Sequence, residues 1–132
     1  MTRVRFLKFW SITVGSMDTL TGLWLVLCPA GVLRVLHIRP PSPDALVFLS
    51  WIGVFVMAVG LSYGFALGKR GQGEAVWMFT SMARILVAVF LTTSILDESM
   101  ANAWALVAAA DMAVALVQIS VMRAGWWQEV HR

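Results

Sequence analysis

Residues 80 to 92 read TSMARILVAVFLT, a stretch that is apolar enough to lie in a membrane except for Arg84. Holding a guanidinium in hydrocarbon costs at least about 2.5 kcal/mol, so this side chain needs an inward-facing partner. The rest of the chain has the same character, since 60% of its 132 residues are hydrophobic and only 13% are charged. Its mean hydropathy is +0.81. These values predict an integral membrane protein.

The apolar residues form four blocks, each near the ~20 residues that an α-helix needs to cross the hydrocarbon core. The blocks lie at roughly 9–28, 45–68, 75–96 and 103–122. They predict an all-α, polytopic membrane protein, a four-transmembrane-helix bundle formed by a single membrane domain over residues 1–132. Any chemistry must then lie inside the bundle or at its short loops.

The connection after the first block has its own apolar pattern, in the sequence PAGVLRVLHIRPPSPD at residues 29–44. Val32, Leu33 and Leu36 recur at helical spacing, which predicts a short interfacial helix lying in the headgroup region. Such a helix either acts as a lid or only seals the outer end of the bundle. Three prolines then interrupt the chain, and Asp44 is expected to cap the second membrane helix.

Basic residues indicate the orientation, because Lys and Arg in short flanking loops stay cytoplasmic. Two cations, Arg34 and Arg39, lie on one side, and seven lie on the side of both termini: Arg3, Arg5, Lys8, Lys69, Arg70, Arg123 and Arg132. We therefore expect a multi-pass protein of the cell (inner) membrane with both termini cytoplasmic. The pI of about 9.8 indicates contact with anionic lipid and no nucleic-acid partner.

Aromatic residues near the ends of the blocks are expected to anchor the helices at the two membrane interfaces. Those at the inner interface are Phe6, Phe9, Trp10, Trp77, Trp126 and Trp127, and those at the outer interface are Phe48, Trp51 and Trp104.

Three ionisable residues share one depth in the predicted bundle. At ~1.5 Å per residue, Asp18, Arg84 and Asp111 each lie within roughly 2 Å of the centre of their apolar blocks. Charged residues at this depth face the bundle interior and pair, so both carboxylates are expected to point at the guanidinium. The three charges sum to −1, so either one carboxyl holds a proton or a cation, proton or protonated ligand completes the site.

Small and polar residues indicate which faces turn inward. Tyr63 and Gln118 are expected to be secondary polar members of the site, on the cytoplasmic side of the charged layer. The second block has Gly53, Gly60, Gly64 and Gly68 along one face, a pattern that lets another helix approach closely. These glycines pack either within the monomer or at the seam of a homodimer.

Several of these segments together resemble the DoxX-like superfamily of small membrane proteins. They are GLWLVLCPAGVLRVL at 22–36, WIGVFVMAVGLSYGFAL at 51–67 and SMARILVAVFL at 81–91, followed by the acidic Asp111. The resemblance implies a four-helix bundle, and some relatives act as membrane subunits of quinone-linked redox systems. It transfers no catalytic residue, and the chain lacks the paired cysteines of a thiol-redox relative.

Two functions stay open at this point. In the first, the chain is an accessory protein whose ligand-binding or proton-relay residues are Asp18, Arg84, Asp111, Gln118 and Tyr63, with a small amphiphile such as a quinone or a lipid as ligand. In the second, it is a structural subunit of a larger membrane complex, and the buried charges serve only helix packing. No nucleophile motif, metal-ligand spacing or phosphate-binding loop points to an enzyme or a metal site.

Overall fold

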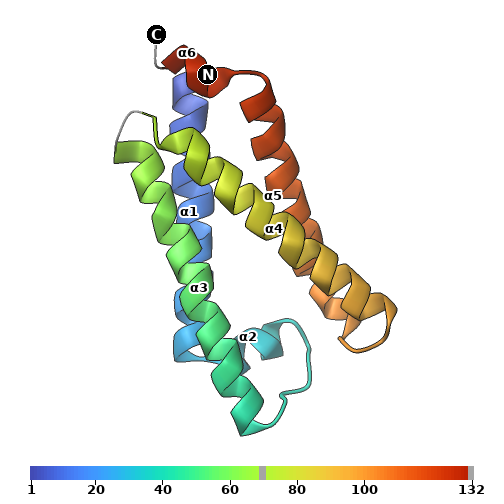
Figure 1. The fold of residues 1–132 in the computed structure, drawn as a ribbon. Helices are drawn as coiled ribbons and strands as arrows, with labels where there is room; N and C mark the ends of the chain where they lie inside the picture. The colour runs from blue at the N-terminus through green and yellow to red at the C-terminus, as the bar shows by residue number, and fades with distance from the viewer. Residues whose placement is uncertain (69–70, 131–132) are drawn as a thin grey trace. The chain divides into compact units, whose positions relative to one another are not determined.

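The computed structural model describes residues 1–68 and 71–130, and every regular element in these ranges is helical (Figure 1). Three of the cations used to predict orientation, Lys69, Arg70 and Arg132, lie outside the described residues. The chain divides into two compact units, Met1–Lys69 and Arg70–Arg132.

The first unit starts with α1, Arg3–Leu27. This helix begins six residues before the predicted apolar block, because Thr2 caps it and the following residues contain no helix breaker. The Thr2 hydroxyl accepts a hydrogen bond from the backbone N–H of Arg5 over 3.4 Å. The basic segment at the N-terminus is therefore helical.

A sharp bend at Cys28 separates α1 from the short helix α2, Pro29–Val35. The residue before a proline is disfavoured in the helical region, and Cys28 accordingly has φ −148° and ψ 70°. The two helix axes differ by 115°. The predicted short helix after the first apolar block is thus present, with Leu33 buried against the rest of the unit.

The third helix, α3, runs from Pro43 to Gly68. The expectation that Asp44 caps it is wrong, since Asp44 lies inside the first turn. The Ser42 hydroxyl takes this role and accepts a hydrogen bond from the N–H of Ala45 over 3.4 Å. Pro43 occupies the first helical position, where its missing N–H costs nothing.

Glycines bring the backbones of α1 and α3 together (Figure 1). A Cβ atom added to Gly53 would lie 2.8 Å from the carbonyl oxygen of Gly22, and one added to Gly60 would lie 2.7 Å from that of Gly15. The predicted glycine face is therefore confirmed as a packing face for its first two members. A Cβ at Gly64 or Gly68 would meet nothing within 4 Å.

The second unit is a helical hairpin followed by a short helix. Its first arm is α4, Gly73–Leu96. After a turn, the 3₁₀ helix η1 (Asn102–Trp104) leads into the second arm, α5, Ala105–Arg123. Gly125 then adopts φ +72°, a conformation that suits glycine, and the chain continues into α6, Trp126–Val130.

Two of the predicted interface anchors, Trp77 and Trp127, are buried. Their rings form an edge-to-face pair with centroids 5.4 Å apart. The turn at Gly125 directs α6 back onto the start of α4, so Trp127 packs within the unit. Hydropathy alone does not separate such a contact from an interfacial anchor, since both use an amphipathic indole near a helix end.

Three helical segments are long and apolar enough to cross a membrane: Pro43–Gly68, Gly73–Leu96 and Asn102–Arg123. They match the last three predicted blocks within two residues. The bent pair α1 and α2 passes the same test only as one broken span. Within residues 1–68 and 71–130 there are therefore three such helices, or four if the bent pair counts as one span.

Candidate functional site

The buried face of α4 positions Arg84. Its buried side chains recur every three or four residues, which places them on one side of the helix, facing inward: Trp77, Thr80, Ser81, Arg84, Ala88 and Leu91. The sequence predicted that Arg84 faces inward, and its place on this buried face confirms that prediction. Arg84 is only 6% exposed, so its charge lies inside the protein.

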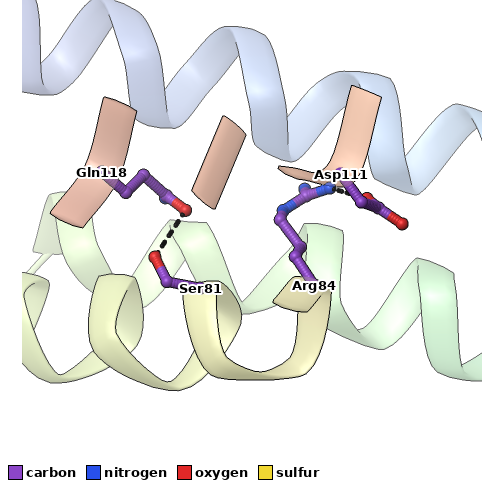
Figure 2. A network of polar contacts seen from close by, with 4 residues as sticks. All are labelled: Ser81, Arg84, Asp111 and Gln118. Atoms are coloured by element: carbon purple, nitrogen blue, oxygen red, sulfur yellow. Dashed lines mark hydrogen bonds and ion pairs between the residues drawn. The ribbon is translucent and has the colours of Figure 1, made fainter. Parts of the chain in front are cut away.

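Arg84 forms an ion pair with Asp111 across the hairpin (Figure 2). Its Nη1 donates a hydrogen bond to Asp111 Oδ1 over 2.5 Å. The pairing that the equal depths predicted is thus confirmed for this carboxylate. The side chain of Asp111 is 18% exposed against 6% for Arg84, so the carboxylate is the more accessible partner.

A second polar contact lies one helical turn away (Figure 2). The Ser81 hydroxyl donates a hydrogen bond to Gln118 Oε1 over 3.1 Å, and both residues are buried. The sequence predicted Gln118 as a polar member of the site but did not predict its contact with Ser81. Their spacing was the signal for this contact, because Ser81 lies one turn from Arg84 and Gln118 lies two turns from Asp111.

The other two predicted site residues belong to the first unit. Asp18 lies on α1 and is 6% exposed, and Tyr63 lies on α3 and is 1% exposed. The Tyr63 side chain packs beside Gly15, where a Cβ would lie 2.8 Å from Tyr63 Cβ. Both residues are buried, as expected. The pairing of Asp18 with Arg84 stays a prediction, as does the role of all five residues in ligand binding.

The geometry also divides the charges between the two units. Arg84 and Asp111 carry +1 and −1, so the ion pair of the second unit is neutral when both are ionised. Asp18, the third residue of the predicted charged layer, belongs to the first unit.

An open crevice is lined by residues of α4 and α5 and was not predicted from the sequence. Its volume is about 260 Å³, and its lining is apolar except for Ser81: Met78, Ser81, Met82, Ile85, Leu86, Ile119 and Met122. Methionine side chains are flexible and polarizable, so they adapt to ligands of irregular shape. Ser81 links the crevice to the buried polar contacts.

No protein-family model matches this chain, and neither a curated protein nor a solved structure has significant similarity to it. Any function therefore rests on the residues and geometry of the chain itself.

Proposed function

We propose that this chain is a small accessory protein of the cell (inner) membrane that binds an amphiphile such as a quinone at a polar site in its interior. In this proposal the chain crosses the membrane four times, with both termini in the cytoplasm. Asp18, Arg84 and Asp111 form the charged layer of the site, and Tyr63 and Gln118 add hydrogen-bonding groups. The function agrees with the resemblance to the DoxX-like superfamily.

The Arg84–Asp111 ion pair is the observation that carries the proposal. Both residues lie in segments that can cross a membrane. Ionisable groups at that depth are expensive and usually mark a binding site or a proton path. A buried pair also adds little net stability compared with apolar side chains of the same volume. The partial exposure of Asp111 leaves one side of the pair within reach of a ligand.

The crevice supports an amphiphile as the ligand. Its volume of about 260 Å³ is just below that of common small-molecule pockets, ~300 Å³ and more. Methionine, isoleucine and leucine side chains suit a hydrocarbon tail, and the hydroxyl group of Ser81 suits a carbonyl or hydroxyl head.

The competing function is structural. Here the ion pair and the Ser81–Gln118 hydrogen bond only fix the register of the hairpin, in a small subunit of a larger membrane complex or in a homodimer. Buried ionic groups can serve such specificity without taking part in any chemistry.

The test compares ligand binding by the wild-type protein and by the triple variant Asp18→Asn, Arg84→Leu and Asp111→Asn in lipid nanodiscs. The measurement is the amount of decylubiquinone retained per chain after equilibrium dialysis. We expect near-stoichiometric retention by the wild type and at least a tenfold loss in the triple variant, with helix content unchanged. Asp97→Asn, which removes a carboxylate outside the candidate spans, is the matched control. Equal retention by wild type and triple variant would overturn the proposal and favour the structural function.

A further inference from the structure

Trp127 of helix α6 packs against the start of α4. Trp127 is 6% exposed and packs edge-to-face on Trp77. Its six-membered ring occupies the space that a Cβ of Gly73 would fill, with Trp127 Cε3 only 2.9 Å from that position. Gly73 therefore forms a seat for the indole, and any larger residue there would expel it.

Within the described part of the chain, the packed indole of Trp127 contains an unpaired hydrogen-bond donor. The Nε1–H group of Trp127 is buried and has no hydrogen-bond acceptor among the residues that the structure describes. A conformation that buries an unpaired donor is about fivefold or more less populated than an otherwise equal conformation in which the donor has an acceptor. At a membrane interface the same N–H group would meet water or lipid carbonyl groups, which is why tryptophan is common there.

Two further features permit α6 to leave its seat. Gly125 has φ +72° and forms the turn between α5 and α6, so the hinge is a residue without side-chain restriction. The helix itself has only five residues, too few to be stable alone in water. Docking of Trp127 and the helical structure of α6 therefore depend on each other.

We propose that α6 is a strap with two states of similar free energy. In the docked state Trp127 occupies the Gly73 seat, and in the released state its indole lies at the membrane interface. The docked strap covers Gly73 and Trp77, one turn before the Ser81–Gln118 hydrogen bond. Its release opens this end of the hairpin toward the buried polar groups. The proposal is independent of the ligand and goes beyond the function proposed above.

The first experiment removes the seat. Gly73→Ala places a methyl group where the Trp127 ring lies, while the backbone of Gly73 needs no glycine-specific conformation. Gly68→Ala is the matched control, since a Cβ there meets nothing within 4 Å. The measurement is amide hydrogen exchange at Gln128 and Glu129, whose N–H groups both donate to the carbonyl oxygen of Gly125. We expect exchange about tenfold faster or more in Gly73→Ala and unchanged exchange in the control. Amide exchange at the wild-type rate in Gly73→Ala would contradict the proposed role of Gly73 in holding Trp127.

The second experiment removes only the unpaired donor. A synthetic C-terminal segment carrying 3-benzothienylalanine at position 127 replaces the indole N–H by sulfur and keeps the ring system. Ligation at a cysteine that is then desulfurised restores Ala124, and a chain with tryptophan at position 127, made the same way, is the control. We expect exchange at Gln128 and Glu129 to slow about fivefold or more, because the docked state no longer buries an unpaired donor. Equal or faster exchange would show that the N–H group does not favour release, and it would overturn the two-state strap.

Discussion

Arg84 and Asp111 lie 27 residues apart in the chain, and a 2.5 Å hydrogen bond joins their side chains across the α4–α5 hairpin. The two partners differ in one chemical respect that decides how the protein responds to their loss. A carboxylate left alone can take up a proton, whereas a guanidinium keeps its charge at any accessible pH. The two single substitutions should therefore not be equivalent.

Asp111→Asn should destabilise the protein by about 3 kcal/mol, because it leaves the buried guanidinium without this carboxylate. Arg84→Leu should cost less, since Asp111 can become neutral. The double variant should recover much of the loss. The measurement is the free energy of unfolding in mixed detergent micelles. Additive losses in the double variant would contradict a direct coupling between the two residues.

Ser81→Ala should destabilise the protein by about 1–3 kcal/mol, because the amide oxygen of Gln118 loses a buried donor. Ser120→Ala is the matched control. Ser120 is exposed on α5, and its hydroxyl donates to the carbonyl oxygen of Leu116 in the same helix. The same unfolding measurement should give a change near zero for the control.

Gly53→Ala should destabilise the first unit by about 1–3 kcal/mol, because the added methyl group would lie 2.6 Å from Leu25 Cβ. Gly64→Ala on the same helix should be neutral or stabilising, since its Cβ enters open space and alanine favours a helix by about 1 kcal/mol. Thermal unfolding of both variants tests this contrast. If both destabilise equally, the glycine contact between α1 and α3 is wrong.

Reporter fusions should place the positions after Arg70 and at the C-terminus in the cytoplasm, and the position after Pro43 outside. A reporter at the N-terminus then decides the number of crossings. Four crossings put both termini on the same side, whereas three put them on opposite sides. We expect cytoplasmic signals from both termini. Opposite signals would mean that α1 and α2 together do not cross the membrane.

Asp97, at the end of α4, should lose a local hydrogen bond at low pH. Hydrogen bonds from Ser99 hold the pKa of Asp97 below the usual value of 3.8, and the bond from the Ser99 side chain has a larger effect than the bond from its backbone N–H. A lowered pKa means that the carboxylate stabilises the turn above about pH 4 and that this contribution disappears as the pH falls through the folded-state pKa. Protection of the Ser99 amide from exchange should follow this titration. In Asp97→Asn it should not depend on pH in this range.

The helices and the central ion pair were predictable because the membrane imposes strong rules. Apolar blocks of about 20 residues have few alternatives to a helix in a bilayer. A charge at the depth of Arg84 has to face a partner, and Asp111 was at matching depth on the next helix. This pairing could be predicted because an unpaired charge inside a membrane has a high free energy.

The contacts that could not be predicted from the sequence depend on where one helix meets another. Gly53 and Gly60 lie in the same stripe as Gly64 and Gly68, and only the position of α1 decides which of them make contacts. The seven-residue spacing between Gly15 and Gly22 matches that between Gly53 and Gly60, and it was a usable signal. The packing of Trp127 against Gly73 had no signal in the sequence, because it depends on the turn at Gly125.

The glycine contact between α1 and α3 also has a consequence for biosynthesis. α1 leaves the ribosome before α3, yet it reaches the apolarity of a span only together with α2. A segment of this kind is a weak substrate for insertion by the translocon on its own. Gly15 and Gly22 give the later helix α3 a surface on which the two backbones can meet. We therefore expect the first helix to settle in the bilayer only after α3 has been synthesised, with the pair inserting as one hairpin.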